Sequence, residues 1–265
     1  MKVCVLYFSL YGNTYKIANE IYKTLSGLSA SVELVRIWKD ISLSSLQCDV
    51  LVVGSPVHYF SAPRYVFERL DTLANGQGRP AAIFVTHGGA PATTINDLAI
   101  FLESKGWLPI AAREFVSYDY FEPYRPFWLH FGRPNERDLK MARDFAFAIF
   151  HAASHHDPNT WKRSRIPLLP INKLIFGRIH ELVKKWLPRK KFIPSRCTNC
   201  KRCAKACPTG AIIDSPAQQV ISKCINCYEC ARACPTKAIS ADWRKVRFFA
   251  RLYAPLVNRI WKNKY

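Results

Sequence analysis

The sequence predicts a doubly wound α/β domain of about five parallel strands, followed by a small α+β domain built around cysteines. Two observations carry this prediction. Over residues 1–150, short apolar runs alternate with segments of helical period, and eight of the ten cysteines fall after residue 196 in two copies of one pattern. Strands that are apolar along their whole length and alternate with helices are typical of a parallel sheet covered on both faces.

The elements of the first domain follow one another in a regular order. The predicted strands are VCVLYF at 3–8, SVELVRI at 31–37, DVLVVGS at 49–55, PAAIFVTHG at 80–88 and LPIAAREFV at 108–116. Helices are expected near 13–25, 63–73 and 93–105, with a closing helix near 134–151. Because Cys4 and Cys48 lie in apolar, strand-like surroundings, we interpret both as core residues.

The loop after the first strand has the composition of an anion site. It reads Ser9-Leu10-Tyr11-Gly12-Asn13-Thr14 and leads directly into a helix. Hydroxyls, backbone amides and the positive end of a helix can converge there on a phosphate. The loop lacks the glycine patterns of dinucleotide-binding folds and nucleoside triphosphatases, which favours a monophosphate. The ordinary alternative is a strand-to-helix turn with a cap.

Each cysteine run has three cysteines at intervals of three, a fourth after a gap of four, and then a proline. The two runs are Cys197, Cys200, Cys203, Cys207 with Pro208, and Cys224, Cys227, Cys230, Cys234 with Pro235. Three thiolates on one loop can bind three corners of an iron–sulfur cube. A zinc site would use two separated pairs instead. A disulfide framework suits a secreted domain, whereas this chain begins MKVCVLYFS, so we expect a reducing interior.

The cysteine region resembles the bacterial-type two-cluster ferredoxins. CTNCKRCAKACPTGAI and CINCYECARACPTKAI are two copies of the repeated unit of that family. The resemblance implies two [4Fe-4S] clusters with crossed ligands, since the fourth cysteine of each run binds the cluster of the other. One cluster is then held by Cys197, Cys200, Cys203 and Cys234, and the second by Cys224, Cys227, Cys230 and Cys207.

The first domain resembles the flavodoxins, whose Thr-x-Thr-Gly-Asn-Thr loop wraps the phosphate of FMN. Ser9, Gly12, Asn13 and Thr14 match this pattern, and Tyr11 departs from it. The resemblance implies two more FMN loops, which are Ser55-Pro56-Val57-His58-Tyr59 and Thr86-His87-Gly88-Gly89.

Side chains in these two loops have expected roles and ordinary alternatives. Tyr59 or His58 is the expected stacking side chain, and Gly88 and Gly89 permit close approach to the flavin ring. As an alternative, His58 and Tyr59 are exposed loop residues without a role. His87 either donates to the ring or caps the following helix.

As a whole the chain resembles a flavodoxin–ferredoxin fusion, a family found mostly in anaerobes. We expect an FMN-binding domain at 1–153, a basic amphipathic linker at 154–195, a two-cluster domain at 196–241 and a basic aromatic helix at 242–265. The implied function is electron transfer between FMN and two [4Fe-4S] clusters, converting between two-electron and one-electron steps. The alternative is a flavin-dependent oxidoreductase for a small substrate or quinone, with the clusters as its relay. The carrier is favoured because no acid–base pair stands out near the flavin loops.

Charge divides the chain sharply. Residues 151–265 hold 24 Lys and Arg against 5 Asp and Glu, whereas residues 1–150 hold 15 against 14. Two segments, 166–187 and 243–260, place apolar and aromatic residues at helical spacing among basic ones, and Pro255 is expected to kink or interrupt the second. The residues expected to share one face of the second segment are Trp243, Val246, Phe249, Ala250, Tyr253, Leu256 and Ile260.

These basic helices have three interpretations. Packing on the two domains is the commonest arrangement for amphipathic helices. Peripheral contact with an anionic membrane, on its cytoplasmic face, fits the basic and aromatic composition. Docking to acidic redox proteins, as electron donor and acceptor, fits the charge. We expect a cytoplasmic protein that binds no nucleic acid, because no reading motif is present, and no stretch reaches the ~20 apolar residues of a membrane span.

Overall fold

The computed structural model describes residues 1–28, 31–155 and 186–262 of the 265-residue chain. The predicted amphipathic segment at 166–187 therefore lies outside the described residues, except for its last two positions. Within the part of the chain that is described, no helix is long and apolar enough to cross a membrane.

A five-stranded parallel sheet forms the centre of the first domain and confirms the predicted fold class. Its strands are β1 (Lys2–Tyr7), β2 (Ser31–Arg36), β3 (Val50–Pro56), β4 (Pro80–His87) and β5 (Leu108–Val116), in the order β2-β1-β3-β4-β5. The strands β3 and β4 are buried along almost their whole length, whereas β2 alternates exposed and partly buried residues at the edge. The strands β3 and β4, which are mostly apolar, thus lie inside the sheet where both faces are covered, and the less apolar β2 lies at its edge.

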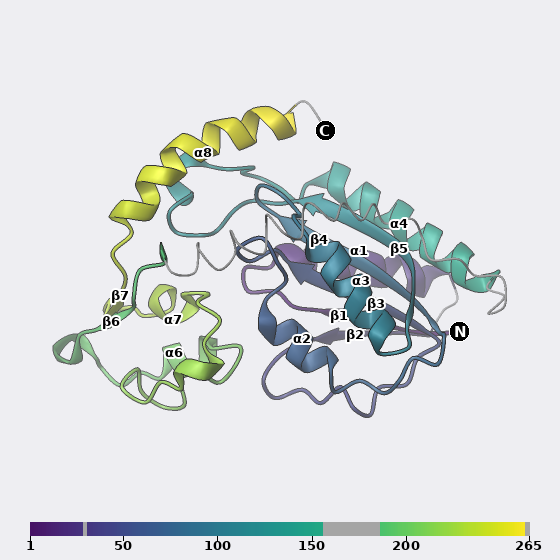
Figure 1. Ribbon diagram of the computed structural model, residues 1–265, viewed down its shortest axis with the longest axis horizontal. Coiled ribbons are helices and arrows are strands. Elements are labelled where there is room, and N and C mark those ends of the chain that lie inside the picture. Colours follow the sequence, from purple (N-terminus) through teal and green to yellow (C-terminus); the bar gives the residue numbers. More distant parts are fainter. Residues whose placement is uncertain (29–30, 156–185, 263–265) are drawn as a thin grey trace.

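Helices cover both faces of this sheet (Figure 1). The helices α1 (Asn13–Gly27) and α4 (Glu136–Ser154) pack on one face, and α2 (Arg64–Leu70) and α3 (Thr94–Ser104) pack on the other. Cys4 and Cys48 are buried in the second of these layers, which confirms their interpretation as core residues. All the strands end at one edge, so the loops that follow β1, β3, β4 and β5 are neighbours.

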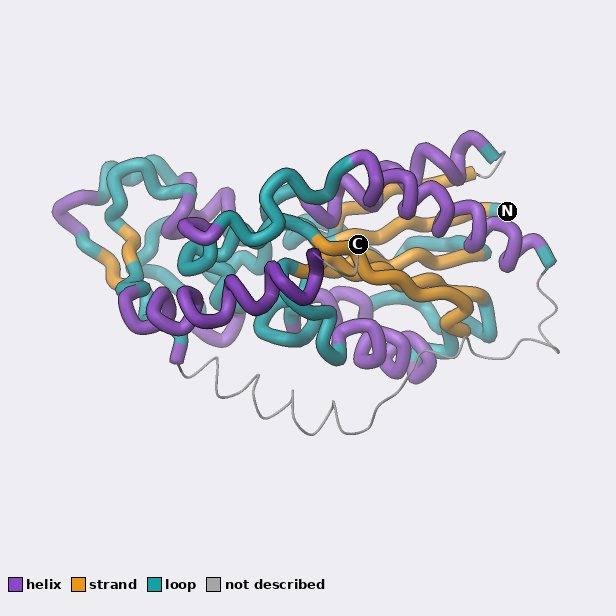
Figure 2. Tube along the Cα trace, turned by 90° about the horizontal axis from the view of Figure 1, so that it is seen from above, coloured by secondary structure: helices purple, strands orange, loops and turns teal. Residues whose placement is uncertain are grey.

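The second domain is small and has few regular elements. The strands β6 (Lys191–Phe192) and β7 (Ile239–Ser240) pair antiparallel, and the short helices α6 (Arg202–Ala206) and α7 (Glu229–Arg232) lie between them in sequence. Figure 2 shows that loops make up most of this domain. Strand β6 falls inside the segment predicted as a linker, yet it pairs with the last strand of the cysteine domain.

Helix α8 (Arg244–Lys262) follows the second domain and continues through Pro255, so of the two expected effects of this proline, a kink or an interruption, the interruption does not occur. The buried residues of α8 include Ala250, Ala254 and Val257. Phe249 and Leu256, which were expected to share a face with Ala250, are exposed instead. At 100° per residue these two side chains lie well to one side of the stripe of small residues, which lets the helix approach the protein closely.

Candidate functional site

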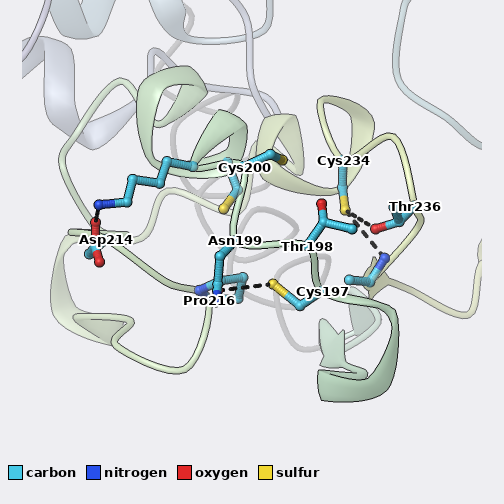
Figure 3. A pocket seen from close by; sticks show the side chains of 11 residues that line it. Cys197, Thr198, Asn199, Cys200, Asp214, Pro216, Cys234 and Thr236 are labelled. Atoms are coloured by element: carbon cyan, nitrogen blue, oxygen red, sulfur yellow. Dashed lines mark hydrogen bonds and ion pairs between the residues drawn. The ribbon is translucent and has the colours of Figure 1, made fainter.

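One cavity in the second domain is lined by the first three cysteines of one run and the last cysteine of the other. Its lining includes Cys197, Cys200, Cys203 and Cys234 (Figure 3). The Cys234 sulfur accepts a hydrogen bond from the Ala238 amide at 3.2 Å. The structure therefore brings together the four cysteines that the crossed ligand set assigns to one cluster.

A second cavity is lined by the other four cysteines. Cys224, Cys227 and Cys230 come from one loop and the start of α7, while Cys207 follows directly after α6. Helix α6 ends at Ala206, and Cys207 has an extended backbone. The chain therefore leaves the helix direction at Cys207, which lines the second cavity. The crossed assignment of ligands stays a prediction, and the lining of both cavities agrees with it.

The two cysteine loops share an unusual backbone. Asn199 and Lys201 in the first run, and Asn226 and Tyr228 in the second, all have φ between 53° and 58°. Non-glycine residues rarely adopt this left-handed conformation. Its recurrence two and four residues after the first cysteine of each run shows that both loops curl in the same way, which places cysteines three residues apart around one cavity.

The donor chemistry of both cavities suits iron–sulfur clusters. Burial raises the pKa of the Cys230 thiol to about 11, and it also raises the pKa of Cys203 and Cys227. These thiols would stay protonated at neutral pH unless a bound metal displaced the protons. No three His, Cys, Asp or Glu side chains of the described residues lie close enough to hold a single metal ion. Four sulfurs spread around a cavity fit a cluster, whose corners they can each bind.

The loop between β1 and α1 has the features that an anion needs. Gly12 precedes α1 with φ +92°, no side chain caps the first turn, and that turn holds no acidic residue. The Gly12 amide donates to Ser9 Oγ at 3.1 Å, and a Cβ atom at Gly12 would meet no atom within 4 Å. The first turn of α1 therefore has backbone amides without a side-chain cap, and such amides are the groups that bind a phosphate at a helix start.

Hydrogen bonds join this first loop to its neighbours. Thr14 Oγ1 lies 2.8 Å from Thr86 Oγ1, and both residues are buried. Asn13 Nδ2 donates to the carbonyl of Tyr118 at 2.8 Å. These two predicted site residues thus position the loops that follow β4 and β5.

Arg36 adds a positive charge that sequence reasoning missed. It ends β2, beside β1, and its Nη2 donates to the Ser9 carbonyl at 2.9 Å. Its guanidinium carbon lies 3.8 Å from the centroid of the Trp38 ring, so the side chain is held in place. The signal available in the sequence was a basic residue at the carboxyl end of the strand SVELVRI.

The loop after β3 is held in a strained turn. His58 and Ser61 exchange backbone hydrogen bonds, while Tyr59 between them has φ +51°. The Val57 amide donates to the Thr86 carbonyl at 2.9 Å, and Ser55 and Pro56 belong to β3 itself. Burial lowers the pKa of His58 to about 4, so its imidazole is neutral at physiological pH.

The loop after β4 contains a buried histidine and two glycines. His87 Nε2 lies 3.8 Å from a carboxylate oxygen of Glu114 on β5. Because α3 begins at Thr94 with Thr93 as its N-cap, His87 does not cap that helix. A Cβ atom at Gly88 would come within 2.5 Å of Asp119, so only glycine fits there, and Gly89 follows it.

Asp119 is a second residue that sequence reasoning missed. It follows β5 and accepts a hydrogen bond from the Phe121 amide at 2.9 Å. Burial of the carboxyl raises its pKa to about 6, against which the Phe121 hydrogen bond is the smaller effect. A titratable group therefore lies against Gly88, beside the loop predicted to meet the flavin ring.

The loop after β5 also contributes aromatic rings. Tyr120 stacks on Tyr11, with ring centroids 5.1 Å apart and an interplanar angle of 14°. Phe121 meets Tyr59 edge-on at 5.7 Å. The dense aromatic run YDYFEPYRPFW directly after the fifth strand was the available signal for this fourth loop.

The second cysteine loop is seated on these aromatic residues. Tyr59 donates its hydroxyl to the Asn226 carbonyl at 2.7 Å, and Tyr11 donates to the Cys227 carbonyl at 3.5 Å. Ile225 packs against the core of the first domain. Burial raises the pKa of both tyrosines well above the usual value, so both hydroxyls remain protonated donors. The loop that lines the second cavity therefore contacts two of the loops predicted to bind FMN.

Comparison with protein-family models finds two domains. Residues 4–116 match a flavodoxin domain, and residues 196–239 match a 4Fe-4S dicluster domain. The chain therefore carries a flavodoxin domain followed by a ferredoxin-like domain.

Many solved structures resemble the first part of the chain, and three of them are flavodoxins described as follows. An archaeal flavodoxin is 21% identical, with a TM-score of 0.47, over 58% of this chain and 100% of its own. A short-chain flavodoxin associated with a non-canonical PDU bacterial microcompartment is 18% identical, with a TM-score of 0.44, over 58% and 99%. Flavodoxin 1 from Bacillus cereus is 16% identical, with a TM-score of 0.44, over 59% and 100%. The comparison with curated proteins found no match.

Proposed function

We propose that this protein is an electron carrier in which electrons pass between FMN, a [4Fe-4S] cluster in the second cavity, a [4Fe-4S] cluster in the first cavity and an external partner. A flavodoxin domain joined to a 4Fe-4S domain makes an FMN and iron–sulfur electron-transfer protein. The order of centres rests on one observation. Tyr59 and Tyr11 hydrogen-bond the Asn226–Cys227 segment of the loop that lines the second cavity.

The residues of the chain have separate tasks in this proposal. Ser9, Gly12, Asn13 and Thr14 hold the phosphate of FMN, and the Arg36 guanidinium favours its charge. His58 or Tyr59 would stack on the flavin ring, and Gly88 and Gly89 would allow the backbone to approach its edge. FMN supplies the conversion between two-electron and one-electron transfer, and each cluster carries one electron.

The external partner is expected at the first cavity. Cys200 is exposed, whereas the described cysteines of the second cavity are buried or partly buried. Basic residues surround the first cysteine run, and these are Arg196, Lys201, Arg202 and Lys205. An acidic redox protein is the partner that this surface would attract.

A second candidate function is favoured by Asp119. A flavin-dependent oxidoreductase for a small substrate or quinone needs a group that exchanges protons near the flavin, and a carboxyl with a pKa of about 6 can do so. Its test is turnover: under anaerobic conditions, with a chemical reductant in excess as electron source, the purified protein would reduce added quinone to quinol over many turnovers, and this reduction would slow in the Asp119→Asn variant.

The carrier proposal is tested by flash photoreduction of the full-length protein, purified anaerobically with about eight iron, eight sulfide and one FMN per chain. Electrons delivered to the flavin should appear on the clusters at a rate that does not depend on protein concentration. In Cys207→Ser, which removes a ligand of the second cavity, this transfer should fall by at least about tenfold, because the remaining cluster is the distant one.

Cys234→Ser is the matched control. It loses a ligand of the first cavity, so flavin-to-cluster transfer should continue while transfer to an external acceptor falls. Each variant should lose about half of the iron, and their electron paramagnetic resonance spectra should lose different clusters. Equal loss of flavin-to-cluster transfer in both variants would contradict the proposed order of centres.

A further inference from the structure

Helix α8 packs against the rest of the molecule through one narrow side. Ala250, Ala254 and Val257 are buried, and Val257 packs with Val116 and Leu129 of the first domain. Figure 1 shows α8 leaving the second domain and passing over the loop between β5 and α4. The helix therefore bridges the two domains and uses its small residues to do so.

The start of α8 is fixed as well. The Trp243 ring packs against Tyr228 at 4.5 Å and against Phe121 at 5.1 Å, measured between ring centroids. Arg247 donates to Glu122 at 2.9 Å. Because contacts hold both its beginning and its middle, the side of α8 that faces solvent is determined.

That outer side presents large apolar side chains. The exposed fractions are 64% for Phe248, 49% for Phe249, 66% for Leu252 and 57% for Leu256. Residues four apart lie above one another on a helix, so three of them form one stripe, with Phe249 beside it. Trp186, which is 59% exposed, meets Phe249 edge-on at 5.3 Å. We call these five residues the outer face of α8.

Exposed basic residues lie within and beside the outer face. Lys245 and Arg259 fall close to the stripe at 100° per residue, and Arg251 flanks it. The surrounding half of the chain is strongly basic, with 24 Lys and Arg against 5 Asp and Glu over residues 151–265. The outer face therefore combines bulky apolar groups with cations and has no acidic side chain within α8.

We propose that the outer face of α8 docks on an anionic lipid surface. Contiguous apolar side chains on a helix tend to be covered, because each is stabilised by leaving water. The first domain does not cover them, since α8 packs there through its opposite side. Phe, Leu and Trp on one face with Lys and Arg around it is the composition of helices that lie in a membrane interface.

A lipid surface fits this face better than an acidic protein does. The stripe lies on the solvent-facing side of α8. There the apolar side chains can enter the acyl region, while the charged ends of the Lys and Arg side chains reach the headgroups. A protein partner would need a matching groove along the whole helix. In the docked protein, α8 lies along the membrane surface with the flavodoxin domain packed on its other side.

Vesicle sedimentation with the full-length holoprotein tests this proposal. The protein should bind vesicles of phosphatidylcholine and phosphatidylglycerol far more tightly than vesicles of phosphatidylcholine alone, and added salt should weaken binding. The triple change Phe248→Ser, Leu252→Ser and Leu256→Ser should weaken it by at least about a hundredfold, and Leu252→Ser alone by about tenfold.

The matched control places serine at two exposed apolar positions elsewhere. Ile100 on α3 and Phe147 on α4 are 40% and 51% exposed, and the variant Ile100→Ser, Phe147→Ser should bind vesicles like the parent. Circular dichroism and cofactor content show that each variant is folded. The proposal is overturned if the parent protein does not bind anionic vesicles, or if the triple variant binds them as tightly as the parent. It is also overturned if sedimentation velocity shows that the outer face joins two copies of the chain.

Discussion

Asp119 is the residue whose chemistry depends most on its neighbours in space. Nothing in the run Tyr118-Asp119-Tyr120 distinguishes it from an ordinary loop carboxylate. In the folded protein it lies against Gly88 and among aromatic loops, and burial raises its pKa to about 6. The folded state therefore binds a proton at Asp119 more tightly than the unfolded chain does, which links folding to pH.

The pH dependence of stability should reveal this linkage in the flavin-free protein. Between about pH 4 and pH 6 the parent loses stability as Asp119 ionises in its buried site, and the cost is fully present above pH 6. Asp119→Asn cannot ionise, so it should be more stable than the parent above pH 6, by about 3 kcal/mol, with no difference below about pH 4. Urea unfolding across this range measures the effect. Asp144→Asn, at an exposed position on α4, is the control. The linkage is refuted if the difference in the free energy of unfolding between Asp119→Asn and the parent is the same at every pH.

At the scale of single elements, the two ends of α1 differ in the way that the proposed phosphate site requires. Its first turn begins after Gly12 at positive φ and lacks both a capping side chain and an acidic residue. Its far end, at Gly27, has an ordinary backbone and open space around it. One helix thus contains a glycine with a left-handed backbone at the proposed phosphate site and a second glycine with an ordinary backbone away from it.

Alanine at these two glycines should have different effects. Gly12→Ala places a side chain at φ +92°, which costs about 1 kcal/mol or more and distorts the loop, so FMN affinity should fall by about tenfold. Gly27→Ala should leave affinity unchanged and stabilise α1 slightly. Titration of the flavin-free protein with FMN, followed by quenching of flavin fluorescence, measures both. Equal affinity for Gly12→Ala and the parent would argue against a phosphate site at this loop.

At the scale of the whole molecule, the two domains are stabilised differently. The first has apolar layers on both faces of its sheet. The buried cluster of the second domain contains seven residues, of which three are the cysteines Cys203, Cys207 and Cys230. So small a core needs bound metal to hold it together.

Removal of iron should therefore unfold one domain and spare the other. After treatment with a chelator, hydrogen exchange followed by mass spectrometry should show lost protection over 191–240 and retained protection in β1, β3 and β4. FMN should still bind, with quenched fluorescence. Simultaneous loss of protection in the central strands would mean that the two domains fold as one unit.

The sequence by itself determined that the first domain is a parallel sheet between layers of helices, and that eight cysteines form two copies of one repeat. Both are encoded locally: apolar runs specify buried strands, and a spacing of three brings cysteines of one loop together. The boundaries of the strands differ from prediction by only a residue or so, as at β1 and β3. Gly12 stays a predicted phosphate-site residue: the sequence shows a single glycine between a strand and a helix, and the structure gives that glycine a φ of +92°.

Only the tertiary structure decided how the loops predicted to bind FMN meet the second cysteine loop. The contact of Tyr59 with Asn226 and the placement of Asp119 against Gly88 join residues far apart in the chain, and no local spacing specifies which loops become neighbours. The same holds for α8: its periodicity predicts a helix, yet both Ala250 and Phe249 are apolar, and the one that packs inward depends on the surface that receives it. Composition determines that a helix has an apolar side, whereas shape and close packing determine which side is buried.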